Sequence, residues 1–348
     1  MQDRIFGQIQ GADIHEVTLR SASGMEAKVL TWGAAVRDLL IPTARGLQRV
    51  VVGYNSTDDY AADTAHAGAI AGRFANRITR GRFELDGRFH QLPLNQDNRH
   101  TLHGGGDGQG FSRRPWTLET YDSSSVTLSL QTPDGDAGFP GNLDVRCVYR
   151  LSDAATLRVE LTATTDAPTP CNLASHSYFN LELPVGFANS AVPNAVDHEF
   201  MAQADFYTPV DDDLIPTGEV LAVRGTPFDF RRARPLRNPE GVKYDVGLVL
   251  RSRPSSVGDL RHAGTLSGPR TGMALDVYTT EPHLQLYDGG SFKGPGVGLD
   301  GARYGQHCGI CLEPQRYPDS PNRSHFPDAT LRPGETYRQV TEYRFRVP

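Results

Sequence analysis

Two histidines, His100 and His103, stand directly before a run of three glycines at residues 104–106. Histidine is the side chain best suited to exchange protons near neutral pH, and glycine lets the backbone approach a ligand closely. The same pair of histidines could instead bind a metal ion, but no convincing third ligand lies near them in the sequence. We therefore predict no metal site and consider His103 a candidate for proton transfer.

A second segment, residues 172–181, contains His176 and Tyr178 within an apolar stretch. On its own it is typical of a structural histidine beside core aromatic residues. A third candidate is Glu313, which ends an apolar run and precedes a proline. A carboxylate that enters a site from a buried strand can have its pKa tuned by burial, as a general base requires. A surface glutamate at a strand end is the alternative.

Asn76 and Arg77 form a fourth candidate, in the segment Gly-Arg-Phe-Ala-Asn-Arg-Ile at residues 72–78. The amide and the guanidinium are forked hydrogen-bonding groups of the kind that suit sugar hydroxyls. An arginine in a surface ion pair would look the same in the sequence. Each of these four segments is weak evidence for a functional site when taken alone, and the occurrence of all four in one chain is much stronger evidence.

The composition excludes several classes of partner. The 348 residues carry a formal net charge of −6, whereas nucleic-acid binding needs a dense basic face. The basic cluster Arg231-Arg232-Ala233-Arg234 is interpreted as a solvated surface turn. From the polar N-terminal pattern and the lack of a long apolar stretch we expect neither a signal peptide nor a membrane span. The four cysteines, including the pair Cys308 and Cys311, indicate reduced, buried thiols in a cytoplasmic protein.

Short alternating segments separated by Gly, Pro, Asp and Asn dominate the chain, which has 36 Gly and 24 Pro. Residues 126–130 and 157–161 alternate apolar and polar side chains with period two, as a half-buried strand does. Asp86-Gly87 predicts a tight hairpin turn, and residues 56–65 predict one brief helix. We therefore predict an all-β fold, a large antiparallel β-sandwich with few short helices, formed by a single domain over residues 1–348.

Four segments together resemble the aldose 1-epimerase (galactose mutarotase) family. Residues 72–78 resemble its G-R-x-A-N-R-I segment, and residues 102–105 its L-H-G-G. Residues 172–181 match N-L-x-x-H-S-Y-F-N-L, and residues 313–322 are similar to E-T-Q-x-Y-P-D-S-P-N. The last two motifs are long enough to be specific.

This resemblance implies a β-sandwich with an open cleft, no cofactor and no metal, and an isomerase that interconverts the α and β anomers of free aldohexoses such as galactose or glucose. Glu313 matches the general base, which takes the proton of the C1 hydroxyl. His176 matches the general acid, which protonates the ring oxygen, and His103 matches a second histidine near these oxygens. The positions that match substrate contacts are Asn76, Arg77, Tyr178, Asp245 and Gln285.

Two charges are expected from these roles: an ionised Glu313 near pH 7, and a protonated His176 whose pKa the nearby carboxylate raises.

The chain departs from the family pattern at two places. The histidine that usually follows the aspartate is Val246, which puts the sugar-binding edge of the pocket in question. The threonine that usually follows the glutamate is Pro314, which removes a backbone donor.

Two alternatives stay open at this point. A related enzyme that acts on hexose 6-phosphates would gather arginines for the phosphate, with Arg73, Arg77, Arg113 and Arg114 as candidates. A non-catalytic carbohydrate-binding protein on the same fold would have lost the acid or the base, and both are present. The expected partner is a small-molecule sugar, with no nucleic acid and no membrane, and the expected assembly is a monomer or weak homodimer.

Overall fold

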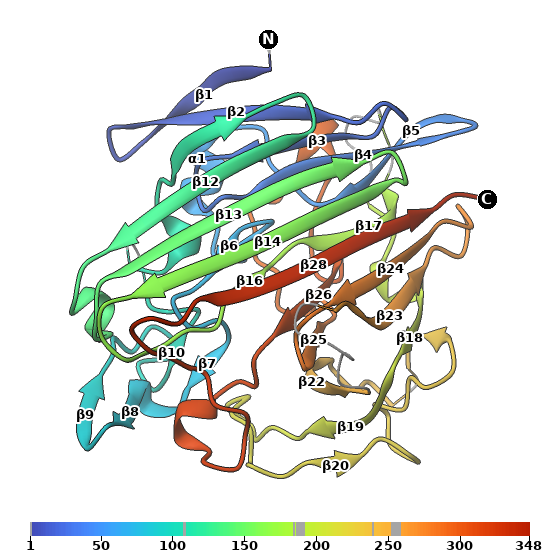
Figure 1. The fold of residues 1–348 in the computed structure, drawn as a ribbon. Helices are drawn as coiled ribbons and strands as arrows, with labels where there is room; N and C mark the ends of the chain where they lie inside the picture. Colours follow the sequence, from blue (N-terminus) through green and yellow to red (C-terminus); the bar gives the residue numbers. More distant parts are fainter. Residues whose placement is uncertain (1, 107–108, 184, 186–191, 239, 252–258) are drawn as a thin grey trace.

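The computed structural model is built around two large antiparallel sheets stacked face to face (Figure 1). The structure describes residues 2–106, 109–183, 185, 192–238, 240–251 and 259–348. In this part of the chain the larger sheet has eleven strands, in the order β1 (Asp3–Ile9), β2 (Ala12–Arg20), β3 (Glu26–Leu30), β4 (Val36–Thr43), β5 (Gly46–Val51), β17 (Tyr178–Leu183), β26 (Ile310–Gln315), β25 (His283–Tyr287), β22 (Asp245–Leu250), β19 (Ala204–Thr208) and β20 (Leu221–Ala222).

The second sheet has nine described strands, in the order β11 (Thr117–Tyr121), β12 (Ser125–Thr132), β13 (Leu143–Ser152), β14 (Thr156–Thr165), β28 (Tyr337–Arg346), β24 (Ala274–Thr279), β23 (Arg261–Ser267), β18 (Glu199–Ala202) and β21 (Arg234–Pro235). Short strand pairs complete the described part: β6 (Ile70–Ala71) with β16 (Ala174–Ser175), β7 (Arg77–Ile78) with β10 (Thr101–Leu102), β8 (Arg82–Leu85) with β9 (Arg88–Gln91), and β15 (Thr169–Pro170) with β27 (Thr330–Leu331). This arrangement confirms the predicted antiparallel β-sandwich.

The predicted local elements are confirmed where the sequence signal was clear. The alternating segments 126–130 and 157–161 lie in β12 and β14. The hairpin between β8 and β9 turns at Asp86 and Gly87, which both have positive φ (49° and 78°), as a two-residue turn of this kind requires. Such backbone angles suit the dipeptide Asp-Gly.

Among the residues that the structure describes, helices occur only as short pieces. The α-helix α1 (Thr57–Ala62) begins after Ser56, whose Oγ accepts the backbone N–H of Asp59 at 3.2 Å. A serine in this position satisfies one of the free N–H groups at a helix start. The described part also contains six single 3₁₀ turns: η1 (Thr79–Gly81), η2 (Phe111–Arg113), η3 (Asp136–Gly138), η4 (Ala195–Asp197), η5 (Leu299–Gly301) and η6 (Ser320–Asn322). No helix in the described ranges has both the length and the apolar character to cross a membrane.

The central strands of the larger sheet alternate between two faces. Leu312 of β26 pairs with Leu286 of β25, which pairs with Val246 of β22, and all three side chains lie in the hydrophobic core between the sheets. Side chains of successive strand residues point to opposite faces. The neighbouring residues Glu313 and Gln285, which also pair with each other, therefore face away from this core.

Candidate active site

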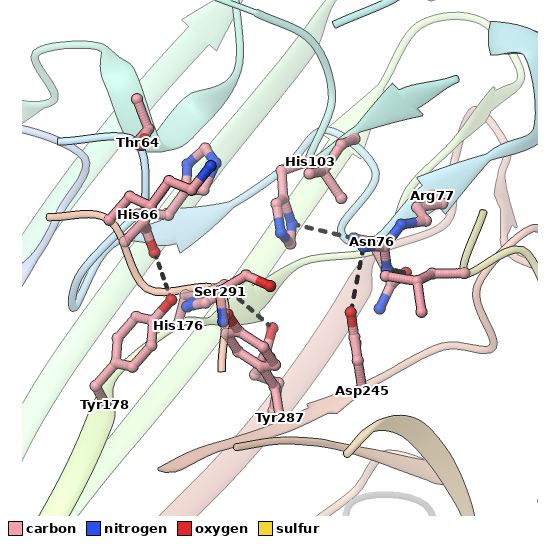
Figure 2. A pocket seen from close by; sticks show the side chains of 15 residues that line it. Thr64, His66, Asn76, Arg77, His103, His176, Tyr178, Asp245, Tyr287 and Ser291 are labelled. Atoms are coloured by element: carbon pink, nitrogen blue, oxygen red, sulfur yellow. Dashed lines mark hydrogen bonds and ion pairs between the residues drawn. The ribbon is translucent and has the colours of Figure 1, made fainter. Parts of the chain in front are cut away.

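A cavity of about 250 Å³ lies on the face of the larger sheet that points away from the inter-sheet core (Figure 2). Its floor is formed by side chains of β17, β26, β25 and β22, and segments around β7 and β10 form a wall. Seven of the residues predicted from the sequence line it: Asn76, Arg77, His103, His176, Tyr178, Asp245 and Glu313. The eighth, Gln285, lies behind Asp245.

His103 and Asn76 stand side by side in the wall. Nδ1 of His103 accepts the backbone N–H of Asn76 at 3.2 Å, and the backbone N–H of His103 donates to the carbonyl oxygen of Asn76 at 2.9 Å (Figure 2). Because Nδ1 is an acceptor, the neutral ring carries its proton on Nε2 and can donate it in a hydrogen bond. Burial lowers the pKa of His103 well below its usual value, which favours this neutral form.

Gly104 allows two backbone segments of this wall to lie in close contact. Its φ is +81°, and a Cβ at this position would lie 2.1 Å from the carbonyl oxygen of Gly72. The glycine predicted to let the backbone approach a ligand thus lets it approach another segment of backbone. That contact positions the neighbouring His103.

His176 and Glu313 meet at the floor of the cavity, where Nε2 of His176 lies 3.9 Å from Oε2 of Glu313. His176 precedes β17, and Glu313 is in the adjacent strand β26. The residues are 5% and 2% exposed, so water screens their charges little. Oε2 of Glu313 has no hydrogen-bond partner among the described residues. It is therefore an acceptor available to a bound molecule.

Burial opposes charge on both members of this pair. Burial, together with a smaller contribution from the charge of His66, lowers the pKa of His176 to about 3. It raises the pKa of Glu313 well above the usual value, and Asp245 raises it further, whereas Arg77 opposes the rise. The prediction that the carboxylate keeps His176 protonated by raising its pKa was therefore wrong. The same finding corrects the expectation that Glu313 is readily ionised, because desolvation outweighs the attraction within the pair.

Asp245 is held at the cavity edge by two donors. Nη2 of Arg77 donates to Oδ2 at 3.2 Å, and Nε2 of Gln285 donates to Oδ1 at 2.6 Å. Nη1 of Arg77 also donates to Oδ1 of Asn76 at 3.2 Å. Arg77 thus links Asn76 and Asp245 into one polar edge (Figure 2), and Gln285 acts on this edge from behind.

Tyr178 lines the cavity with its ring. Its hydroxyl donates to the carbonyl oxygen of Ala65 at 3.0 Å, so the polar end is already engaged (Figure 2). The ring centroid lies 5.2 Å from that of His176, and 6.1 Å from that of Tyr287. The side chain therefore offers an apolar surface to a ligand and supports the imidazole of His176.

His66 is a lining residue that the sequence analysis missed. Its ring lies 4.8 Å from that of His103 and 6.0 Å from that of His176, and its Nδ1 lies 2.8 Å from Oγ of Ser112. The three imidazoles form one cluster. The available signal was a third histidine six residues before the segment 72–78, but the motif itself does not include it. Other lining residues that were missed include Thr64, Leu214, Tyr287, Ser291 and Lys293.

The donor set His176, Cys311 and Glu313 deserves comparison with a metal site, because one ligand atom from each lies within 4.8 Å of the others. Nδ1 of His176 lies 3.6 Å from Sγ of Cys311, whereas Nε2 lies 3.9 Å from Glu313. The imidazole thus turns different nitrogens to its two neighbours. Burial also raises the pKa of Cys311 well above its usual value, which disfavours the thiolate that binds metals. Within the described residues, the arrangement does not suit a metal ion.

The remaining sequence candidates lie outside the cavity. His100 is buried, and its Nδ1 accepts the backbone N–H of Arg80 at 3.1 Å. Cys308 and Cys311 are free and buried, as predicted. Cys308 precedes β26, so only Cys311 belongs to the strand.

The arginines proposed to gather around a phosphate do not do so. Only Arg77 lines the cavity. Arg73 is 1% exposed and donates to carbonyl oxygens at residues 140–141. Arg113 donates to backbone carbonyls and Arg114 pairs with a carboxylate, and none of these partners lines the cavity. This geometry does not support a hexose 6-phosphate site built from these four residues.

The first departure from the family pattern does not change the cavity wall. Val246 is 2% exposed and packs in the inter-sheet core, on the face opposite to Asp245. Gly247 does face the cavity side, and a Cβ there would lie 1.9 Å from Nε2 of His283. The missing side chain at Gly247 thus gives room to the buried imidazole of His283.

The second departure, Pro314, is accommodated by the sheet. The pairing of β17 with β26 extends only to Cys311. Two residues beyond Pro314, the backbone N–H of Arg316 donates to Oδ1 of Asn172 at 2.7 Å, on the side away from β25. Backbone N–H groups two residues apart on a strand point to the same side. The donor that proline removes therefore lies where β17 no longer pairs with β26.

Known proteins are similar to this chain in sequence and in fold. The chain matches the family described as aldose 1-epimerase over residues 15–344. It is 36% identical over 351 residues to the galactose mutarotase of Bos taurus, an alignment that covers 99% of this chain and 98% of that protein. It is also 36% identical over 341 residues to the aldose 1-epimerase of Escherichia coli (strain K12), with 94% of each chain covered.

Two solved structures are similar over nearly the whole chain. A GalM/aldose epimerase homologue from C. elegans has a TM-score of 0.86 at 29% identity and covers 95% of this chain and 98% of its own. The galactose 1-epimerase from Lactobacillus acidophilus NCFM has a TM-score of 0.82 at 29% identity, with 99% and 98% covered.

Proposed function

The chain belongs to the aldose 1-epimerase family and interconverts the α and β anomers of aldoses, and on that basis we propose that Glu313 and His176 perform the proton transfers. The observation that carries this assignment is their 3.9 Å separation in one buried cavity, where Oε2 of Glu313 has no hydrogen-bond partner among the described residues. An unpaired buried acceptor is costly unless a ligand satisfies it. The C1 hydroxyl of a sugar would do so.

The two pKa shifts are compatible with this chemistry because the reaction conserves the protons of the pair. In ring opening, the Glu313 carboxylate accepts the C1 hydroxyl proton while the His176 imidazolium protonates the ring oxygen, and the C1–ring oxygen bond breaks. The products are a neutral carboxylic acid, a neutral imidazole and the open-chain aldehyde. Rotation about C1–C2 followed by the reverse transfers closes the ring to the other anomer.

The pair carries one proton in both states, and only its position differs. Burial favours the neutral pair, which is the state that accompanies the open-chain sugar. The ion pair that starts ring opening must then be stabilised by the cyclic sugar, whose C1 hydroxyl donates to Glu313. Such hydrogen bonds to the charged form lower the pKa of a carboxyl group.

The surrounding residues hold the sugar in place. His103 donates from Nε2 to an oxygen on or near C1, and Asn76, Arg77 and Asp245 bind ring hydroxyls along the polar edge. Gln285 is a positioning residue that acts through Asp245. Fixing the sugar in this way supplies orientation, which adds to the acid–base effect.

The substrate we propose is a free aldohexose such as galactose or glucose. The test is polarimetry on freshly dissolved α-D-galactose, α-D-glucose and α-D-glucose 6-phosphate with catalytic amounts of the full chain. We expect the rotation of the free sugars to decay far faster than in buffer, with little effect on the phosphate. Decay of all three sugars at the buffer rate would refute the substrate assignment, and preference for the phosphate would replace it.

We further propose that the chain acts as one domain, as a cytoplasmic monomer or weak homodimer. The continuous hydrophobic core between both sheets supports the single domain. Light scattering coupled to gel filtration over a range of concentrations tests the assembly, and a stable higher oligomer would contradict it.

A further inference from the structure

A second hollow, of about 710 Å³, is lined mostly by the segment that follows the short edge strand β20. The ribbon of β20 lies near the bottom of Figure 1. The lining of the hollow is strongly basic because most of the lining side chains are arginine. Five arginines line it, together with a single carboxylate, Asp229; the five are Arg224, Arg231, Arg232, Arg234 and Arg251. We call it the arginine hollow. Three of these arginines belong to the cluster that the sequence analysis interpreted as a solvated turn, and the fold adds two more from elsewhere in the chain.

Three of the five guanidinium groups are held in fixed positions. Arg231 binds both carboxylate oxygens of Asp229, at 2.8 and 2.6 Å. Arg251 binds both carboxylate oxygens of Asp205, at 2.6 and 2.5 Å. These bidentate pairs fix the plane of each guanidinium and hence the direction of its remaining N–H groups.

Arg234 is held by different contacts. Its guanidinium lies 4.1 Å from the ring centre of the buried Phe230, and it donates to the carbonyl oxygens of Asp229 and Pro227. A cation over an aromatic face is attracted by the ring. The hollow therefore has a rigid wall before any ligand binds.

The other two arginines, Arg224 and Arg232, are exposed. Neither forms a hydrogen bond or ion pair with another described residue. Five arginines against the two carboxylates of Asp205 and Asp229 leave a local charge of +3, in a chain whose net charge is −6. Like charges gathered in a hollow repel one another, and an anion relieves this repulsion.

We propose that the arginine hollow binds the phosphate chain of a di- or triphosphate. The planar fork of arginine matches phosphate oxygens in a bidentate manner, and the hollow contains arginine with no lysine. A chain of two or three phosphates carries enough charge to balance the local excess and can reach several guanidinium groups at once. Arg224 and Arg232 close on this ligand from the exposed side.

The arginine hollow and the cavity of the acid–base pair lie at opposite ends of one strand. Asp245 begins β22, and Arg251 directly follows its last residue, Leu250. Six residues of extended strand separate the two by about 20 Å. The proposal therefore stands independently of the assigned epimerase residues, and the catalytic activity reports whether a variant has folded.

The test is calorimetric titration of the full chain with tripolyphosphate, pyrophosphate, ATP and orthophosphate at 0.15 M salt. The variant R224A/R232A removes the two exposed arginines of the hollow. The control R45A/R150A removes the same charge from two exposed arginines elsewhere, in the β4–β5 hairpin and in β13. We expect saturable tripolyphosphate binding by the wild type and the control, at least tenfold weaker binding by R224A/R232A, and unchanged epimerase activity in all three.

The ligands separate the possible sources of the phosphate chain. Equal binding of ATP and tripolyphosphate means that the phosphate chain alone is recognised, and tighter binding of ATP means that a nucleoside adds contacts. Both results support the proposal. It is overturned if none of the polyphosphates binds saturably, if both double variants lose binding equally, or if a hexaglutamate peptide binds as tightly as tripolyphosphate.

Discussion

The Nε2 atom of His176 and the Oε2 atom of Glu313 lie 3.9 Å apart at the floor of the cavity on the larger sheet. Burial lowers the pKa of the first group and raises the pKa of the second. The pair therefore holds one proton in total, and this number is the same before and after ring opening. Its chemistry leads to the first two predictions.

Replacing the base by its amide removes proton acceptance while keeping the shape of the side chain. We expect Glu313→Gln to lower kcat on the order of 10²–10⁴-fold, as for loss of a positioned general base. The melting temperature should not fall, because the raised pKa of Glu313 already favours a neutral carboxyl group, and a neutral amide of the same shape replaces it. Polarimetry and circular dichroism measure the two quantities. The exposed Glu84→Gln is the control, and equal activity of the two variants would remove Glu313 from the mechanism.

The pH dependence of kcat/KM follows from the proton count of the pair. At low pH a second proton is added, and since the pKa of His176 is lowered to about 3 this acid limb should lie far below pH 6.5. At high pH the single proton is lost, and the raised pKa of Glu313 moves this alkaline limb upward. The profile is checked between pH 4 and 10. An acid limb near 6.5 would show instead a histidine with an ordinary pKa.

Asp245 should affect sugar binding as well as the proton on Glu313. In Asp245→Asn one of the donors Arg77 and Gln285 loses its carboxylate acceptor, at a cost of about 1–3 kcal/mol, or about 5- to 150-fold in kcat/KM. Because the charge of Asp245 raises the pKa of Glu313, the alkaline limb should also move to lower pH. The exposed Asp212→Asn should change neither quantity. If Asp245→Asn lowers kcat but leaves the pH profile unchanged, the charge of Asp245 does not influence the pKa of Glu313 and that part of the prediction is wrong.

His66 should make its two neighbouring imidazoles harder to protonate. It lowers the pKa of both His103 and His176, because a positive charge on one ring opposes a second nearby. In His66→Asn we expect both pKa values to rise, which NMR titration of the imidazole C–H protons measures. His90→Asn, on the β8–β9 hairpin, should leave them unchanged. Unaltered titration in both variants would refute the coupling.

The close approach of Gly247 to His283 predicts that a side chain larger than glycine at position 247 destabilises the sheet below the cavity. A Cβ at Gly247 would lie 1.9 Å from Nε2 of His283, so Gly247→Ala must displace the imidazole. We expect a loss of about 1–3 kcal/mol in the free energy of unfolding, measured with urea. The double variant G247A/H283A should recover part of this loss. Gly305→Ala, whose Cβ would meet no atom within 4 Å, is the control.

Recovery in that double variant is the informative result. If G247A/H283A is as unstable as the sum of its two single changes, the residues do not interact and the assigned clash is wrong. If G247A alone is as stable as G305A, the sheet absorbs the methyl group by a backbone shift, which equally contradicts the prediction.

Local sequence determined most of the secondary structure and pointed to the residues that we propose as chemically active. Period-two alternation predicted β12 and β14, Asp86-Gly87 predicted the hairpin, and residues 56–65 predicted the short helix. These features depend on neighbours along the chain, so they can be read from it. The motifs around His176 and Glu313 indicated the acid and the base for the same reason.

Tertiary structure alone decided how these residues act. His176 and Glu313 are 137 positions apart in the sequence, and only the pairing of β17 with β26 brings them together. Their pKa values depend on how completely water is excluded, which no spacing along the chain reveals. His66 was missed because it lies outside the motif at residues 72–78, and the arginine hollow was missed because only the fold adds Arg251 to the segment 224–234. The chemical type of each side chain can thus be read from the sequence. The distances between side chains, their burial and the electrostatic effects on their pKa values arise only when strands far apart in the sequence share one sheet.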